Sequence, residues 1–377
     1  MERHVEMVDN YFKCRTTQGN GVVKDYFEVT DNAASIFVCG NDYLDIANNT
    51  HVINQQIKHM KTDVEDNFRS GTYLRETDPH SRFEKEFEVY FGKQCTLTQS
   101  GYAANTGLMH ALCEKGTQVY IDKFTHASFY EGLYLKGAKI HRYKHNDLLE
   151  LESKIKRYGP GIIIVDSLFS NLGDFAPLKD IVSLKIKHKC VLVVDESHTL
   201  GVYDKRGLLH KLGLGADVDY ITASLAKAYC TRAGIILGGN KAHIKEHSLW
   251  YIFSSPLLKY DVIRLLAMFE VIKNADEKRH HVLKISKVVR KGLATFANVI
   301  ETSQPSPIIC IRFSDENECA RLHRYMVSKG VEASVFIWPA APLKEPMLRI
   351  TVHNGLTLVQ ASFIINVIRS YFISAKL

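Results

Sequence analysis

The stretch VLVVDESHTLG at residues 191–201 decides the fold. Consecutive aliphatic residues that end in acidic ones are typical of a strand buried on both faces, with polar side chains at its carboxyl end. Helix-like stretches such as NDLLELESKIKRYG and PLKDIVSLKIKHK separate several runs of this kind. The alternation predicts an α/β fold with a mostly parallel sheet covered by helices. The strand-like runs are 118–122, 139–143, 161–168, 190–197, 219–224 and 234–239.

The pattern changes after about residue 260. Long helices are predicted over roughly 259–298, followed by the strand SPIICIRF, a helix over ENECARLHRYMVSKG, the strand MLRITV and a helix over 357–373. This order predicts a smaller α+β domain. We therefore expect an N-terminal segment over 1–55, a large domain over 56–258 and a small C-terminal domain over 259–377.

Composition restricts the class of protein. The 377 residues include 48 basic and 41 acidic side chains, a net charge of +7 without the Lys/Arg block typical of nucleic-acid binding. Eight cysteines without a C-x-x-C pair indicate reduced thiols and no zinc site, so no metal is expected. The start MERHVEMVDNYFK lacks the apolar stretch of a signal peptide, and no run of eighteen apolar residues predicts a membrane span. We expect a cytoplasmic protein.

The Asp-Glu-Ser-His sequence at 195–198 allows two interpretations. It resembles the metal-binding carboxylates of an ATPase, but a phosphate loop of the form G-x-x-x-x-G-K-[ST] is missing upstream. It also resembles a strand that delivers a carboxylate and an imidazole to an organic cofactor. The missing loop favours the second interpretation.

The stretch ITASLAKAYCTRAG indicates which cofactor. Lys227 follows a buried strand by three residues, behind Ser224, and a lysine so placed suits a Schiff base with pyridoxal 5'-phosphate (PLP). Asp195 is then the partner of the pyridinium nitrogen, because a carboxylate favours the protonated, electron-withdrawing ring. His198 is placed to hydrogen-bond the phenolic oxygen of the ring.

Two further stretches agree with PLP. SGYAANTGLMHALCEKG, starting at Ser100, predicts a helix that begins at Gly101, and its free N–H groups would form a phosphate seat. His126 follows another strand, where its flat ring could stack on the cofactor. Each feature alone is common in structural roles: a strand-end Asp, a surface Lys, a loop His or a tight turn. Their order along the chain favours a PLP site.

These residues resemble those of the α-oxoamine synthases, PLP enzymes of the aspartate-aminotransferase-like fold type I. The matching stretches extend from residue 41 to residue 352 and, within the group, are most similar to the autoinducer synthases that make α-hydroxyketone precursors. One departure is Tyr73 in Gly71-Thr72-Tyr73-Leu74, where the family commonly has arginine, and it points to a changed substrate pocket. The matching stretches are NDYLDIAN, HSRFE, SGYAAN, THAS, DSLFSNLGDFAPL, DESHTLG, SLAKA, FSSPL and LRITV.

The resemblance implies a set of cofactor contacts and a homodimer with its active site at the interface. It implies that Lys227 binds the cofactor aldehyde and moves the α-proton, and that Arg349 and Asn41 bind the amino-acid carboxylate. The phosphate would be held by backbone amides next to Ser100 and by serines of both subunits. The implied cofactor residues are Ser100, Gly101, Tyr102, His126, Asp195, His198, Ser224, Lys227, Ser254 and Ser255, the last two reaching the partner's phosphate.

The implied reaction joins an amino acid, or S-adenosylmethionine, to a medium or long acyl-CoA with loss of carbon dioxide, giving an amino ketone precursor of an α-hydroxyketone autoinducer. The alternatives are a synthase of the 8-amino-7-oxononanoate synthase or 2-amino-3-ketobutyrate CoA ligase type, or a PLP aminotransferase or decarboxylase. A scaffolding subunit without activity is disfavoured by the presence of Lys227.

Overall fold

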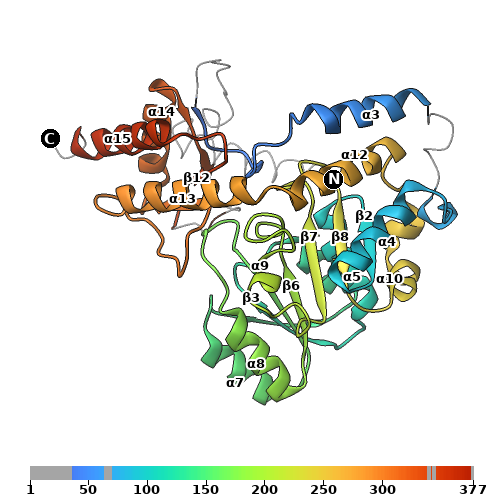
Figure 1. Cartoon of the computed structure of the whole chain (residues 1–377). Helices are drawn as coiled ribbons and strands as arrows, with labels where there is room; N and C mark the ends of the chain where they lie inside the picture. Colours follow the sequence, from blue (N-terminus) through green and yellow to red (C-terminus); the bar gives the residue numbers. More distant parts are fainter. Residues whose placement is uncertain (1–35, 63–69, 338–340, 342–344, 375–377) are drawn as a thin grey trace, which may run out of the picture.

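The structure is a computed structural model that describes residues 36–62, 70–337, 341 and 345–374. The start MERHVEMVDNYFK and most of the predicted N-terminal segment 1–55 lie outside these residues. Figure 1 shows a large lobe around a central sheet and a smaller lobe formed by the C-terminal helices and strands.

The central sheet has seven strands in the order β2-β8-β7-β6-β5-β3-β4. Strand β8 runs antiparallel to its neighbours β2 and β7, whereas the other pairs are parallel, which confirms the mostly parallel sheet. All six predicted strands are present. The strands are β2 (Cys95–Thr98), β3 (Gln118–Asp122), β4 (Lys139–Tyr143), β5 (Ile162–Asp166), β6 (Val191–Asp195), β7 (Tyr220–Ser224) and β8 (Gly234–Leu237).

The sequence analysis missed β2. Its four residues, CTLT, are all buried, but they hold one aliphatic side chain and two threonines. The strand therefore lacks the Ile/Val signal of its neighbours and is specified by pairing with β8.

Both faces of the sheet are covered, and this explains its nearly continuous aliphatic strands. Ile163 and Val165 of β5 belong to a core that includes residues of α4, α7, α8 and α12. Ile162 and Ile164 of the same strand pack with residues of α5, α6 and α10. Because successive side chains of a strand point to opposite faces, each strand needs an apolar residue at every position to fill both cores.

Most helices of the large lobe alternate with the strands of the central sheet along the chain. In Figure 1, α7 and α8 lie side by side at one end of the lobe, and α3 lies along α12. The elements are α3 (Thr50–Thr62), the 3-10 helix η1 (Gly71–Tyr73), α4 (Pro79–Phe91), α5 (Gly101–Leu112), α6 (Ser128–Leu135), α7 (Leu148–Tyr158), α8 (Leu178–His188), α9 (Leu208–Lys211), α10 (Lys241–His247), α11 (Leu249–Phe253) and α12 (Lys259–Lys273).

The smaller lobe is α+β, as predicted. Its three-stranded antiparallel sheet has the order β11-β12-β9, and a second sheet pairs β1 with β10 in parallel. The elements are β1 (Ile36–Phe37), β9 (Ile308–Arg312), β10 (Val331–Glu332), β11 (Ser334–Phe336), β12 (Met347–Thr351), α13 (Asp276–Leu293), α14 (Glu316–Ser328) and α15 (Leu358–Ser374).

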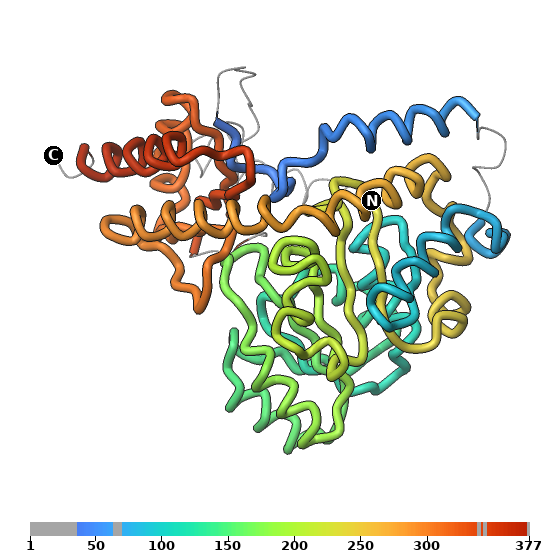
Figure 2. Tube along the Cα trace, viewed as in Figure 1, coloured from blue at the N-terminus to red at the C-terminus, as the bar shows by residue number. Residues whose placement is uncertain are grey.

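Helices α12 and α13 are the long helices predicted over roughly 259–298, and Figure 2 shows them passing from the large lobe to the smaller one. Leu265 and Phe269 of α12 belong to the core of the central sheet. Val282 and Val289 of α13 belong to the core of the smaller lobe. The division into domains 56–258 and 259–377 stays a prediction.

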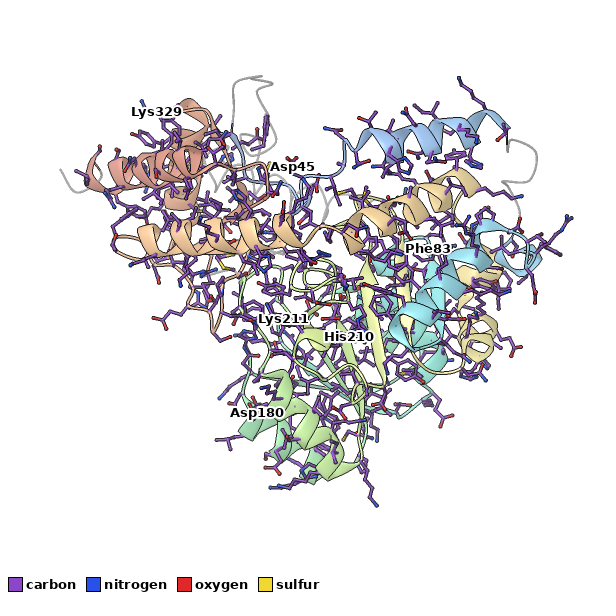
Figure 3. The ribbon with its side chains drawn as sticks, in the orientation of Figure 1. Asp45, Phe83, Asp180, His210, Lys211 and Lys329 are labelled. Carbon is purple, nitrogen blue, oxygen red and sulfur yellow. The ribbon has the colours of Figure 1, made fainter. Side chains whose placement is uncertain are left out.

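Residues 36–48 are bonded to both lobes. In the smaller lobe, the amides of Thr351 and Asn354 donate to the carbonyls of Val38 and Tyr43, at 2.7 and 2.9 Å. In the large lobe, Arg264 Nη2 donates to the Ala47 carbonyl at 3.0 Å. Figure 3 labels Asp45, which lies where this segment passes between the lobes.

The loop after β5 is held by a buried charge network. His145 lies between two carboxylates, with Nδ1 3.0 Å from Asp122 Oδ1 and Nε2 2.7 Å from Asp174 Oδ2. The loop reaches the smaller lobe at Gly173, where an added Cβ would lie 2.3 Å from the Ile308 carbonyl oxygen. The imidazole therefore ties the end of β3 to a loop that packs on β9.

The next two points concern membrane-spanning helices and metal-binding groups. Within the described ranges, no helix is long and apolar enough to cross a membrane. The same residues hold no group of three His, Cys, Asp or Glu side chains arranged around a metal ion.

The His145 network predicts a pH-dependent stability. Burial would lower the pKa of His145, but the hydrogen bonds and charges of Asp122 and Asp174 outweigh it and raise the pKa to about 9. Because the folded pKa exceeds the unfolded value near 6.5, the stabilisation is complete below pH 6.5 and is lost as the pH rises through 9. We expect a loss on the order of 2–3 kcal/mol of unfolding free energy over this window.

Denaturant unfolding at several pH values measures this loss. His145→Gln should be less stable than the wild type at pH 6.5 and should not lose that stability toward pH 9. His141→Gln is the control, because burial lowers the pKa of His141 and the residue is uncharged in this window. An equal pH slope in the wild type and His145→Gln would contradict the network's role.

Candidate active site

The polar residues of the opening stretch lie at the carboxyl edge of the central sheet. Asp195 ends β6, and strand pairing places it beside Asp166 of β5 and Thr222 of β7. Lys227 follows β7, and its ammonium interacts electrostatically with Asp195. The structure therefore brings together the two side chains on which the PLP interpretation depends.

Asp195 and Glu196 point in different directions. Asp195 faces α5, where its Oδ2 accepts a hydrogen bond from Asn105 Nδ2 at 2.8 Å. Glu196 is fully buried toward α9, where Oε1 accepts from the Leu209 amide at 2.9 Å. Burial raises the pKa of Glu196 to about 7. Adjacent strand residues alternate in direction, so these two carboxylates do not converge on one ion.

Asp195 is held rigidly by donors. Besides the Asn105 amide, the backbone N–H of Ser197 donates to its Oδ1 at 2.8 Å. Both carboxylate oxygens are thus oriented, and the side chain is 6% exposed. An anion fixed in this way is suited to face the protonated nitrogen of a ring.

His126 is connected to the same network. Asn105 Nδ2 also donates to Ser128 Oγ at 2.9 Å, and Ser128 Oγ lies 2.7 Å from His126 Nδ1. The imidazole itself is exposed, with its ring 6.5 Å from that of Tyr102 in an edge-on arrangement. The Ser128 hydroxyl thus holds one edge of the ring and leaves its faces open for stacking.

The predicted phosphate seat lies at the start of α5. Ser100 caps the helix, and its Oγ accepts from the Ala103 amide at 3.0 Å. A Cβ added to Gly101 would lie 2.5 Å from Ser224 Cβ, so glycine is required for the approach of these two loops. The first amides of α5, including that of Tyr102, are directed toward the space beside Ser224, as helix geometry demands.

His198 is buried and Lys227 is half-buried, and cationic side chains lie near both. Burial, then the charges of Lys227, Arg349 and His126, lower the pKa of His198 well below 6.5. Burial and the Arg349 guanidinium also lower the pKa of Lys227, and Asp195 opposes that shift. Both groups therefore lose protons more readily than in water, as proton-transfer groups and nucleophiles require.

Arg349 and Asn41, the two residues predicted to bind the substrate carboxylate, contact each other. Arg349, on β12, is 6% exposed, and its Nη2 donates to Asn41 Oδ1 at 2.8 Å. The guanidinium carbon lies 5.3 Å from the centre of the Phe336 ring. Its Nε is buried and has no hydrogen-bond partner within the described part of the chain. This guanidinium has donor capacity for a carboxylate that the protein does not supply.

Ser254 and Ser255 follow α11 and are exposed. The Ser255 carbonyl accepts from Gln99 Nε2 at 2.8 Å, so this turn lies next to the residue that precedes Ser100. Their predicted contact with a partner's phosphate stays a prediction.

Sequence reasoning missed four residues of this site: Tyr43, Asn105, Ser128 and Ser197. Tyr43 OH lies 2.6 Å from His198 Nδ1, and the other three contact Asp195 or His126 as described. Asn105 could have been found, because it lies one helical turn after Gly101 and faces the same way. Tyr43 could not be connected to His198, because 155 positions separate them.

The residues fit the predicted PLP cofactor. A fixed carboxylate, an amine of lowered pKa, an exposed imidazole face and a glycine-bounded helix start converge at one edge of the sheet. Asn105 Oδ1 is buried without a partner within the described residues, and so is Arg349 Nε. Such unpaired buried groups are expected where a ligand supplies the missing contacts.

Comparison with known proteins agrees with this site. Residues 36–365 match the family model "Aminotransferase class I and II". The chain is 36% identical to the CAI-1 autoinducer synthase of Vibrio campbellii over 86% of this chain and 83% of that protein. It is 31% identical to a putative 8-amino-7-oxononanoate synthase of Glaesserella parasuis over 88% of this chain and 90% of that protein.

Solved structures show the same fold. Serine palmitoyltransferase of Sphingomonas wittichii superimposes with a TM-score of 0.85 at 23% identity, over 90% of this chain and 88% of that one. A further serine palmitoyltransferase structure, determined with PLP, has the same TM-score at 22% identity and the same two coverages. At these identities the likeness concerns the fold alone.

The chain therefore belongs to the aminotransferase class I and II family. The predicted fold type I and the resemblance to the α-oxoamine synthases are confirmed.

Proposed function

We propose that this protein joins an amino acid or S-adenosylmethionine to a medium or long acyl-CoA with loss of carbon dioxide, giving an amino ketone precursor of an α-hydroxyketone autoinducer. The main support is the 36% identity to the CAI-1 autoinducer synthase across most of both chains. The 31% identity to a putative 8-amino-7-oxononanoate synthase supports, as the alternative, another synthase of the same group.

The cofactor is PLP, as the sequence predicted, and the protein is a PLP-dependent enzyme. When bound, PLP withdraws electrons from the carbon that carries the substrate's amino group. The predicted seat at Gly101 and Tyr102, with Ser224 opposite, would bind the phosphate, while the His126 ring would stack on the cofactor. Asp195 would face the ring nitrogen, and His198 the phenolic oxygen.

Lys227 would bond to the cofactor aldehyde and later hold the proton of the substrate's α-carbon. Its lowered pKa increases the fraction of uncharged amine, the form that attacks an aldehyde or accepts a proton. Arg349, oriented by Asn41, would bind the substrate carboxylate through its free donors. This pair would place the α-carbon between the lysine and the ring.

Product analysis tests the function. The purified protein with PLP is incubated with a matrix of acyl-CoAs of different length and amino acids, including S-adenosylmethionine. We expect release of coenzyme A together with an amino ketone, identified by mass spectrometry, and a preference for medium or long chains. Formation of 8-amino-7-oxononanoate or 2-amino-3-ketobutyrate would favour the alternative synthases. An oxo acid formed without coenzyme A release would indicate an aminotransferase.

Lys227 is tested by trapping. Borohydride reduction of the wild type should attach PLP to the peptide that contains Lys227, as located by mass spectrometry. Lys227→Ala should lack this adduct and lose about 10³-fold or more in activity, because both bond formation and proton transfer need the amine. Lys211→Ala is the control on α9, labelled in Figure 3. An adduct on another lysine would contradict the assignment.

The predicted homodimer is supported by an exposed apolar surface. Large side chains on η1, α5, α6 and α11 are exposed although these elements pack together. Several exposed apolar side chains on elements that pack together are typical of a subunit interface. Phe253, 79% exposed, precedes the two serines proposed to reach the partner. The other exposed residues are Tyr73, Tyr102, Tyr134, Leu135 and Leu249.

Sedimentation measures this association. We expect the wild type to be a dimer and Phe253→Asp to dissociate at least about tenfold more readily, because it places a charge in an apolar interface. Val359→Asp, which alters an equally exposed residue of α15, is the matched control and should stay dimeric. Equal association of Phe253→Asp and the wild type would place the interface elsewhere.

A further inference from the structure

Tyr43 lies between the two halves of the proposed site. Its side chain is completely buried, and its hydroxyl lies 2.6 Å from His198 Nδ1. The two rings meet edge-on, at 6.1 Å between centres and 76° between planes. The Arg349 guanidinium also acts on this hydroxyl, because its positive charge lowers the pKa of Tyr43 against the larger effect of burial. Tyr43 thus bonds one residue proposed to face the cofactor and lies near one proposed to bind the substrate carboxylate.

The direction of the Tyr43–His198 hydrogen bond follows from the chemistry of the neighbouring groups. A guanidinium can only donate, so Arg349 cannot accept the Tyr43 proton, and His198 Nδ1 is the acceptor within hydrogen-bond distance of the hydroxyl in the described part of the chain. Burial raises the pKa of Tyr43 to about 12, against the opposing effect of Arg349, so the phenol keeps its proton near neutral pH. That proton is directed to His198 Nδ1, which must therefore be the unprotonated nitrogen of the ring.

The protonation of His198 agrees with this direction. Burial and the neighbouring charges of Lys227, Arg349 and His126 lower its pKa well below 6.5, so the imidazole is neutral at pH 7. A neutral imidazole has one N–H. Because Nδ1 accepts from Tyr43, the proton must be on Nε2.

We propose that Tyr43 is a positioning residue that fixes His198 in the Nε2–H tautomer and presents that N–H to the cofactor. The inference rests on the proposed function, in which His198 faces the phenolic oxygen of PLP. An Nε2–H can donate to that oxygen, whereas the other tautomer would present a lone pair and repel it. Tyr43 and His198 thus form a relay with one direction, toward the cofactor, near the Arg349 guanidinium.

The backbone around Tyr43 is anchored well enough for this role. The Asp42 carboxylate accepts from the amides of Ile46 and Ala47, at 3.0 and 2.8 Å, and closes the turn that follows Tyr43. Arg264 Nη2 donates to the Ala47 carbonyl. Arg264 Nε donates to Thr231 Oγ1 at 3.2 Å, and Thr231 lies in the loop after Lys227. The backbone amide of Asn354, in the smaller lobe, donates to the Tyr43 carbonyl.

Nitrogen NMR of the wild-type protein with bound PLP tests the tautomer directly. In protein labelled with ¹⁵N-histidine, the His198 signals are assigned by their loss in His198→Gln. We expect an Nδ1 shift typical of an unprotonated, hydrogen-bonded nitrogen and an Nε2 shift typical of an N–H. A charged ring, or a proton on Nδ1, would overturn the proposal without any Tyr43 variant.

A pair of tyrosine variants tests the cause. Tyr43→Phe removes the donor, and we expect the His198 shifts to move toward a mixture of tautomers, the absorbance of bound PLP to change and kcat to fall about tenfold. Tyr120→Phe is the matched control: Tyr120 is equally buried, and its hydroxyl donates to the Gly159 carbonyl, away from the site. It should change neither the shifts nor the absorbance.

The outcomes separate this inference from the proposed function. Unchanged His198 shifts in Tyr43→Phe, with a raised KM for the amino acid, would mean that Tyr43 orients Arg349 instead, and would overturn the proposal while leaving the enzyme assignment intact. A wild type that makes no product from any acyl-CoA but shows the Nε2–H tautomer and the Tyr43→Phe changes would overturn the proposed reaction and support the relay.

Discussion

The buried carboxylate of Asp195 is the constraint on which the other site residues depend. It stands at the end of β6, beside Asp166 of β5 and Thr222 of β7. Two donors, the Asn105 amide and the Ser197 backbone, fix both of its oxygens. Asn105 also bonds Ser128, which in turn holds His126. The side-chain amide of Asn105 therefore helps to orient both the Asp195 carboxylate and the His126 ring.

A second constraint comes from residues 36–48, which are bonded to both lobes. This segment brings Asn41 to Arg349 and Tyr43 to His198, so the proposed carboxylate and cofactor contacts are held by neighbouring residues. Burial favours the uncharged forms of three ionisable groups in this region. It lowers the pKa of both Lys227 and His198, and it raises the pKa of Tyr43. These three groups therefore serve as directional hydrogen-bonding or proton-accepting groups near the fixed Asp195 carboxylate.

Much of this arrangement could be predicted before the structure was known. The six aliphatic strands, the Gly101 helix start and the separations between Asp195, His198 and Lys227 are local patterns, and local patterns are what hydrophobic periodicity and turn chemistry specify. The parallel sheet then required the strand ends to meet at one edge. Strand β2 was not predicted, because its sequence CTLT lacks the run of aliphatic residues that marks the other strands. Its pairing with β8 becomes evident in the folded sheet. The long helices over 259–298 were predicted, but that they pack in different cores was not, since both are helical by pattern.

The order of residues in the chain by itself predicted the cofactor class, the lysine proposed to bind the cofactor and the acidic partner proposed for its ring nitrogen, because each residue stands within a few positions of a strand end that local sequence predicts. The contacts of Tyr43 with His198 and of Asn105 with Asp195 join positions 155 and 90 residues apart. Such contacts depend on how helices and lobes pack, and packing is a property of many distant side chains together. For the same reason, only the folded structure decides the pKa of His198 and Lys227. The desolvation that lowers both pKa values arises when distant parts of the chain surround these side chains.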